Sequence, residues 1–255
     1  MLISLTKFNI KRPEKLSYDF IFPHGVDAVN QIKSKSLKSF LLKTDEILRK
    51  NNIEYVCEDV TEEKFYEWLP YYTSKMEEHG YDVRAKREWY QEQINKGIHI
   101  KGLFFYQNQK LIGSLIFSLQ NNVAVGAYKA SDRVSIDSHK TSSSLGSIVE
   151  FLFLKVASEN GCELATGRSR NAFGFFNTLG YLEYKLRFGY NIRPSLNIPL
   201  LDSVPVNETG RVLFFGIQDE KFILFSLQPE SEKGIEWFDK KRFVKSGIIV
   251  QELYY

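Results

Sequence analysis

The sequence holds only two cysteines among its 255 residues, Cys57 and Cys162. They lie far apart and lack the spacing of metal ligands, so we expect neither a metal site nor a disulfide framework. The four histidines are scattered, and none is set beside a serine or cysteine as in a hydrolase triad. No phosphate-binding loop and no dinucleotide-binding fingerprint is present. The sequence therefore gives no support to a zinc protein, a triad hydrolase or a nucleotide-binding protein of these common types.

Long apolar runs are also missing from the sequence. No stretch reaches the roughly 18 apolar residues that a membrane-spanning helix needs, and the N-terminal "MLISLTKFNIKRPEK" has no cleavable signal region. These features predict a reducing, cytoplasmic protein without a membrane span. A net charge of +3 with 25% charged residues is ordinary, and it is far from the footprint of a dedicated nucleic-acid binder.

What the sequence does contain is clear periodicity. It predicts helices over 31–50, 62–78, 84–96 and 145–161 and strands over 53–60, 99–107, 110–120, 122–132 and 162–166. A further hairpin is predicted around 218–220, followed by a short helix or turn over 231–247. We expect a mixed α/β domain over 31–199, an N-terminal extension over 1–30 and a β-hairpin extension over 200–255.

The stretch "TSSSLGS" opens the helix that begins at Leu145. Free backbone N–H groups at a helix start, with small residues around them, suit a phosphate or pyrophosphate. The candidate cofactor-binding residues are Ser143, Ser144, Gly146 and Ser147. The alternative is an ordinary helix capped by serine.

A second candidate group follows the strand over 162–166, which ends at a glycine where a ligand can approach the backbone closely. Arginines after it could bind a carboxylate or phosphate in bidentate fashion, and a basic cluster 14 residues later adds to them. The candidate substrate-binding residues here are Gly167, Arg168, Ser169, Arg170, Tyr184 and Arg187, with Lys185 beside them. A solvated basic surface is the alternative.

A third candidate lies in "AYKASD", at the end of the strand over 122–132. Tyr128 is a candidate substrate-binding residue and Asp132 a candidate base. A lone aspartate at a strand end is also a common turn former.

The order of these segments resembles the FemAB-like branch of the GNAT (Gcn5-related N-acetyltransferase) superfamily, over roughly residues 31–194. The matching motifs are His79-Gly80 after a helix pair, Tyr128 to Asp132, Gly161, Gly167-Arg168-Ser169, and Tyr184-Lys185 with Phe188-Gly189. The resemblance implies a GNAT-like mixed, mostly antiparallel sheet flanked by helices, with a small C-terminal β-rich extension.

The resemblance also implies an acyl-type transferase. Such a protein would move an acyl or aminoacyl group from acyl-CoA or aminoacyl-tRNA to an amine of a small molecule or peptide. In that chemistry Lys185 would stabilise the oxyanion, Arg168 would hold an anionic part of a substrate, and Asp132 or a water would take the amine proton. The resemblance leaves a homo-oligomer open.

The sequence departs from the family pattern at two places. Of the coenzyme A signature only Gly146 survives, and Phe176 stands where a GNAT-type tyrosine acid would fall. These departures favour an aminoacyl or otherwise divergent donor. They also keep open a catalytically inactive GNAT-like binding or assembly module. A third hypothesis, an RNA-associated protein, rests on the basic face of the helix over 33–50, which a solvated surface explains equally well.

Overall fold

The computed structural model describes residues 1–23, 26–132 and 144–255. The chain forms two compact units. We call Phe20–Gly167 the α/β unit, and Met1–Asp19 together with Arg168–Tyr255 the composite unit. The composite unit contains both ends of the chain, and the division into segments 1–30, 31–199 and 200–255 stays a prediction. Strands β3 (Lys15–Ile21) and β8 (Leu164–Arg170) each begin in one unit and end in the other.

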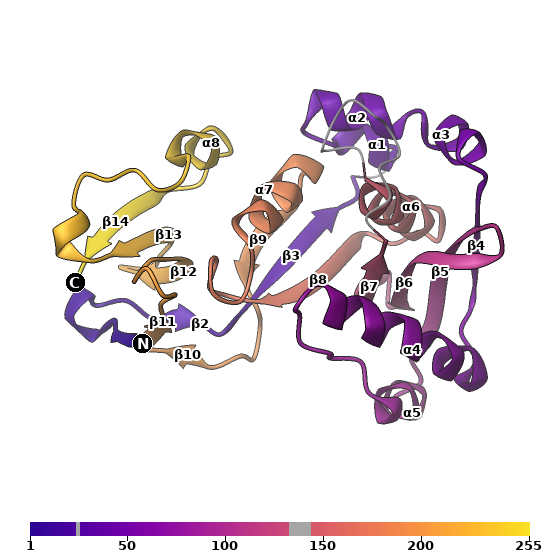
Figure 1. Ribbon diagram of the computed structural model, residues 1–255, viewed down its shortest axis with the longest axis horizontal. Coiled ribbons are helices and arrows are strands. Elements are labelled where there is room, and N and C mark those ends of the chain that lie inside the picture. Colours follow the sequence, from indigo (N-terminus) through magenta and orange to yellow (C-terminus); the bar gives the residue numbers. More distant parts are fainter. Residues whose placement is uncertain (24–25, 133–143) are drawn as a thin grey trace. The chain divides into compact units, whose positions relative to one another are not determined.

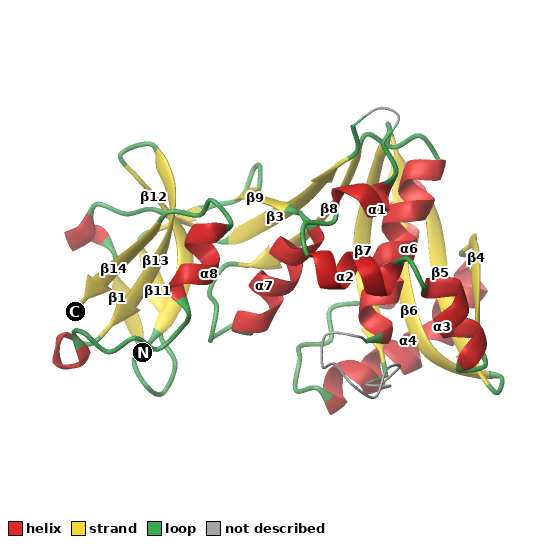
Figure 2. Cartoon of the chain, turned by 90° about the horizontal axis from the view of Figure 1, so that it is seen from above, coloured by secondary structure: helices red, strands yellow, loops and turns green. Residues whose placement is uncertain are grey.

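The α/β unit is built on an antiparallel sheet. Its strands β4, β5, β6 and β7 lie side by side in sequence order (Figure 2). They span Ile53–Asp59, His99–Gln107, Lys110–Gln120 and Val123–Ser131. Two-residue turns join β5 to β6 and β6 to β7, and all four turn residues have positive φ. This geometry is that of the tight hairpin turn that matches the twist of paired strands.

Helices cover both faces of this sheet. They are α1 (Ala28–Gln31), α2 (Lys35–Leu41), α3 (Thr44–Lys50), α4 (Glu62–Glu78), α5 (Arg87–Asn95) and α6 (Leu145–Glu159). Figure 1 shows α6 above and α4 below the strands β5 to β7. Side chains alternate accordingly along β6: Ile116 packs in a cluster with Trp68 of α4, whereas the ring of Phe117 lies 5.3 Å from that of Phe153 of α6.

The composite unit is rich in short strands. A three-stranded sheet contains β12 (Val212–Gln218), β13 (Lys221–Gln228) and the parallel neighbour β14 (Val250–Tyr254). Two smaller antiparallel pairs are β1 (Leu2–Ser4) with β11 (Ser203–Pro205) and β2 (Arg12–Pro13) with β10 (Leu200–Leu201). Strand β9 (Asn191–Pro194) pairs antiparallel with β3 at the end of the seven-stranded sheet, whose strand order is β4-β5-β6-β7-β8-β3-β9. The helical elements are η1 (Thr6–Phe8), α7 (Leu179–Phe188), η2 (Glu230–Glu232) and α8 (Lys240–Lys245).

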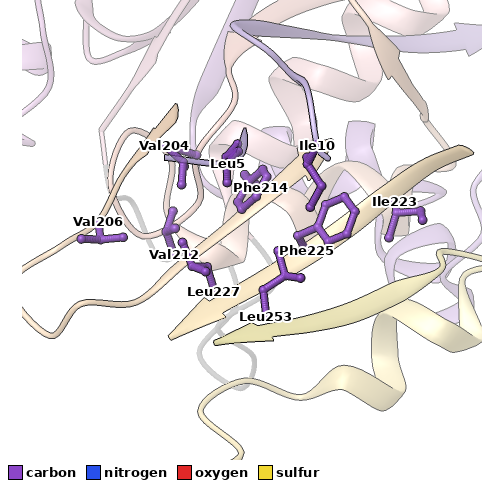
Figure 3. Packing of buried hydrophobic residues seen from close by; sticks show 11 residues of the cluster. Leu5, Ile10, Val204, Val206, Val212, Phe214, Ile223, Phe225, Leu227 and Leu253 are labelled. Atoms are coloured by element: carbon purple, nitrogen blue, oxygen red, sulfur yellow. The ribbon is translucent and has the colours of Figure 1, made fainter. Parts of the chain in front are cut away.

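The core of the composite unit forms where both ends of the chain meet. Figure 3 shows Leu5 and Ile10 from the N-terminal segment gathered with Phe214 and Phe225 of the β12–β13 hairpin. All four side chains are buried. Apolar burial of this kind contributes about 2 kcal/mol per large side chain, which ties the N-terminal segment to the C-terminal sheet.

The predicted fold class is confirmed: the chain is mixed α/β, with a mostly antiparallel sheet flanked by helices. The hairpin predicted around 218–220 is β12–β13. The single helix predicted over 31–50 is wrong, because the chain forms α2 and α3 with a break between them. At that break the Oγ1 of Thr44 donates to the carbonyl of Leu41 at 2.7 Å, a local side-chain bond that competes with helix continuation.

Candidate functional site

The parallel pair of β7 and β8 is short. Its register joins Val123–Val125 to Leu164–Thr166 and ends there. The next residues on the two strands are both glycines, and a β-carbon on Gly167 would lie 3.6 Å from the carbonyl oxygen of Gly126. The two glycines therefore allow the backbones to approach closely where the ladder ends. Beyond this point β7 continues to Ser131 without pairing to β8.

The start of α6 lies against the end of β7. A β-carbon on Gly146 would be 3.3 Å from Oγ of Ser131 and 3.7 Å from Oγ of Ser144. The Oγ atoms of Ser144 and Ser147 are 3.3 Å apart, and Ser147 is buried. Ser144 occupies the cap position without a side-chain capping hydrogen bond. The structure thus brings three of the predicted cofactor-binding residues together; the fourth, Ser143, lies outside the described residues.

Asp132 follows β7 directly and is held by α4. Its Oδ1 lies 3.0 Å from Nζ of Lys75 and accepts a hydrogen bond from the hydroxyl of Tyr71 at 3.4 Å. Its backbone N–H donates to the carbonyl of Ile112 at 2.8 Å. Burial, aided by the Asp132 carboxylate, raises the pKa of Tyr71 above its ordinary value, so the hydroxyl stays protonated as a donor. The pKa of Lys75 is raised above its ordinary value, mainly by the hydrogen bond to Glu78 and next by the hydrogen bond to Asp132.

Tyr128 belongs to an aromatic cluster between β7, α4 and α5. Its ring centre lies 4.9 Å from that of Trp89 and 5.4 Å from that of Tyr72. Burial raises the pKa of Tyr128 to about 12, so its hydroxyl is neutral at physiological pH. The sequence analysis missed this cluster, although the spacing of aromatic residues along α4 was a signal for it.

A buried ion pair lies on the other face of β7. Nζ of Lys129 is 2.7 Å from Oε2 of Glu150, whose side chain is only 4% exposed. The sequence analysis did not identify this pair. A glutamate inside an apolar helix was the available signal, because such a group is rarely buried without a partner.

In the composite unit, Lys185 is a buried lysine among aromatic rings. Its Nζ lies 4.2 Å from the ring centre of Tyr190, 5.8 Å from that of Tyr181 and 5.9 Å from that of Tyr18. The residue is 8% exposed. Burial raises the pKa of Tyr18, so this ring remains a neutral phenol. Ring faces attract a cation most strongly when water is excluded, and this environment differs from that of a solvated surface lysine.

Of the candidate residues on β8, Ser169 lies on one face of the strand and the two arginines lie on the other. Ser169 is buried and its hydroxyl donates to that of Tyr18 at 3.3 Å, so Ser169 and Lys185 meet at the same tyrosine. Successive strand residues point to opposite faces, so Arg168 and Arg170 lie on the other face of β8. Arg168 is exposed, and the guanidinium of Arg170 lies 5.1 Å from the ring centre of Phe176.

Tyr184 and Arg187 are both half-buried on α7. The ring of Tyr184 packs on that of Phe188 at 5.0 Å.

Among the residues that the structure describes, no three His, Cys, Asp or Glu side chains gather closely enough to hold a metal ion. In the same part of the chain no helix is both long and apolar enough to cross a membrane.

No protein-family model and no curated protein matches the chain. Among solved structures, the chain is similar to FemX at 9% sequence identity and a TM-score of 0.51, covering 78% of this chain and 65% of that one. It also matches a conserved protein of unknown function from Bacteroides thetaiotaomicron VPI-5482 (11% identity, TM-score 0.46, 78% and 60% covered). A third match is a tandem GNAT protein from the clavulanic acid biosynthesis pathway (11% identity, TM-score 0.41, 72% and 53% covered). At 9% identity the FemX similarity shows the fold alone, which is GNAT/FemAB-like. The other two TM-scores lie below 0.5 and do not establish a shared fold.

Proposed function

From this GNAT/FemAB-like fold, we propose that the chain is an acyl-type transferase. It moves an acyl or aminoacyl group from an activated donor, acyl-CoA or aminoacyl-tRNA, to an amine of a small molecule or peptide. The observation that carries this proposal is the meeting of three features in the α/β unit. The β7–β8 ladder ends early, β7 runs on to Asp132, and the start of α6 lies against Ser131.

The donor's phosphate groups bind at the start of α6. A helix N-terminus presents backbone N–H groups and a positive dipole end to an anion. Gly146 leaves the backbone accessible, and the hydroxyls of Ser144 and Ser147 are additional donors to phosphate oxygens. Ser143, which lies outside the described residues, keeps its proposed role on sequence grounds alone.

The chemical step is attack of the amine on the donor's carbonyl carbon, which forms a tetrahedral oxyanion. The role proposed for Lys185 is to stabilise that negative charge. The role proposed for Asp132, directly or through a water, is to accept the proton that the attacking amine loses. The thiol of coenzyme A or the hydroxyl of the tRNA leaves when the intermediate collapses.

The remaining candidates have binding roles in this proposal. Arg168 and Arg170 pair with anionic groups of the substrates, because a guanidinium binds carboxylate or phosphate in bidentate fashion. The other residues proposed to contact substrate are Tyr128, Gly167, Ser169, Tyr184 and Arg187.

The donor site is tested by Gly146→Asp. We expect binding of the donor, acetyl-CoA or an aminoacyl-tRNA, to weaken by roughly 100-fold, since like charges brought together in a binding site cost several kcal/mol. The thermal unfolding midpoint should change little, because the favourable effect of an acidic residue in the first turn is offset by the close approach of the new β-carbon to Oγ of Ser131, 3.3 Å away. Calorimetric titration and a thermal melt measure both effects.

Gly180→Asp is the matched control. Gly180 is the second residue of α7, as Gly146 is of α6, and a side chain there meets open space. It should leave donor binding unchanged. Equal donor affinity in both variants would contradict the site at α6.

A second function is favoured by one observation. Oδ1 of Asp132 is already engaged by Lys75 and Tyr71, as in a structural ion pair. This geometry supports a catalytically inactive GNAT-like binding or assembly module. Titration with acetyl-CoA, longer acyl-CoAs and aminoacyl-tRNA distinguishes the two functions, because a module of this kind would bind none of them.

Asp132→Asn separates the two roles of this carboxylate. If Asp132 is the base, kcat falls by on the order of 100-fold. If it is only an anchor, the unfolding midpoint falls and kcat does not. Glu78→Gln is the control, since Glu78 also pairs with Lys75, with its Oε2 2.6 Å from Nζ, but has no proposed part in the chemistry. A kcat of Asp132→Asn no lower than that of Glu78→Gln would remove Asp132 from the mechanism.

A further inference from the structure

The segment from α8 to the start of β14 is strongly basic. Four of the ten residues over 240–249 are lysine or arginine, and none is acidic. The proposed transferase chemistry makes no use of this segment. Its exposed residues therefore call for a separate explanation.

The outward face of α8 combines lysines with an aliphatic side chain. Phe243 is 2% exposed and packs against Phe238, with ring centres 6.0 Å apart. Lys241, Val244 and Lys245 follow the three- and four-residue spacing that places side chains on one helix face. All three are exposed, Val244 at 52%.

The turn after α8 adds a second exposed aliphatic residue. The N–H of Gly247 donates to the carbonyl of Val244 at 2.9 Å, and that of Ile248 to the carbonyl of Phe243 at 3.1 Å. These bonds fold the chain back tightly at the end of the helix. Ile249 comes next, 57% exposed, while its backbone carbonyl accepts a hydrogen bond from Leu224 at 3.0 Å. This hydrogen bond fixes the backbone, and the Ile249 side chain remains exposed to solvent.

The charges on this segment are only partly neutralised within the chain. Two of its four cations are paired, Lys240 with Glu252 and Arg242 with Glu183 and Asp239. Lys241 and Lys245 have no carboxylate partner among the described residues. The two unpaired cations are those that share a face with Val244.

We propose that this face, which we call the α8 face and define by Lys241, Val244, Lys245 and Ile249, binds an anionic lipid surface. Exposed lysines are attracted to a negatively charged leaflet, and exposed aliphatic side chains on the same segment gain by entering the interface. The long lysine stems allow the ammonium groups to remain at the headgroups while Val244 and Ile249 go deeper. A nucleic acid would pair with the same lysines but has no use for two exposed aliphatic side chains.

Co-sedimentation of the full chain with vesicles tests this proposal. We expect binding to vesicles of equal parts phosphatidylcholine and phosphatidylglycerol, no binding to pure phosphatidylcholine, and weaker binding as salt rises. Lys241→Gln with Lys245→Gln should lower the partition coefficient on the order of 30-fold, since each lysine near such a surface contributes about 1 kcal/mol. Val244→Ser with Ile249→Ser should lower it by at least about tenfold, through the apolar area lost.

The controls match each change elsewhere on the surface. Lys33→Gln with Lys35→Gln removes the same charge from exposed positions in the α/β unit, and Leu196→Ser removes an exposed aliphatic side chain. Neither should lower binding more than twofold. The proposal is overturned if anionic vesicles are not bound, or if the controls act as strongly as the test variants. It is equally overturned if serine at 244 and 249 has no effect while RNA binds through the lysines.

Discussion

Replacing Lys185 with methionine is expected to lower kcat/KM by about 100- to 1000-fold, the loss typical when one group that stabilises an oxyanion is removed. The substitution keeps an unbranched apolar side chain that is one heavy atom shorter, and it removes the ammonium group. Methionine also packs favourably against aromatic rings, and three tyrosines surround this position. The unfolding midpoint should therefore change little. Steady-state kinetics on the identified donor and acceptor, together with a thermal melt, measure both effects.

Lys64→Met is the matched control for this variant. Its Nζ also lies over an aromatic ring, 5.1 Å from the ring centre of Phe104, but Lys64 has no proposed role in the chemistry. It should keep kcat/KM within about twofold. If Lys185→Met retains turnover as well as Lys64→Met does, the lysine serves only the packing of α7, and the oxyanion must be stabilised by another group.

The α/β unit was largely predictable because its signals are local. Turn dipeptides with positive φ, at Asn108-Gln109 and Asn121-Asn122, fix hairpins between neighbouring strands. Apolar spacing marks α4 and α6, and Thr61 caps α4 by accepting from the N–H of Lys64 at 3.2 Å. The start of α6 was predicted as an anion site from the serines and glycine alone; the structure brings Ser144, Gly146 and Ser147 together, and the anion site stays a prediction.

Helix α7 was missed because its inward face does not look apolar in sequence. Leu182, Lys185 and Phe188 are its buried residues, and a lysine in the middle interrupts the apolar pattern that predicts a helix. Of the three tyrosines around the ammonium, Tyr181 lies on α7 itself and Tyr190 follows it closely, but Tyr18 comes from β3, far away in the sequence. No local pattern reveals such a partner.

The partners of the candidate site residues were equally hidden. Asp132 pairs with Lys75, 57 positions earlier, and the pair forms only when β7 packs beside α4. The composite unit is the extreme case, since its core joins residues from both ends of the chain. The periodicity of apolar residues indicates which side chains are buried, but it does not indicate which distant residues they pack against.

The buried Asn171 shows what such long-range pairing contributes to stability. Its side chain is 0% exposed; Nδ2 donates to the carbonyls of Pro13 at 2.8 Å and Phe215 at 2.7 Å, and Oδ1 accepts from the N–H of Phe215 at 2.8 Å. The Asn171 carbonyl accepts from Nη1 of Arg12 at 2.6 Å. One side-chain amide therefore provides hydrogen-bond partners for backbone groups of both the N-terminal segment and β12. These groups meet at a position that is buried from water.

Asn171→Ala is expected to lower the free energy of unfolding by about 3–5 kcal/mol, because each buried backbone group left without a partner costs about 1–3 kcal/mol. Urea unfolding followed by circular dichroism measures the loss. Asn177→Ala is the control: this asparagine is half-buried, and its amide donates to one carbonyl, that of Arg170. It should cost about 1 kcal/mol. The large difference between two asparagines six positions apart follows only if Asn171 joins the two ends of the chain, so equal losses in both variants would contradict that role.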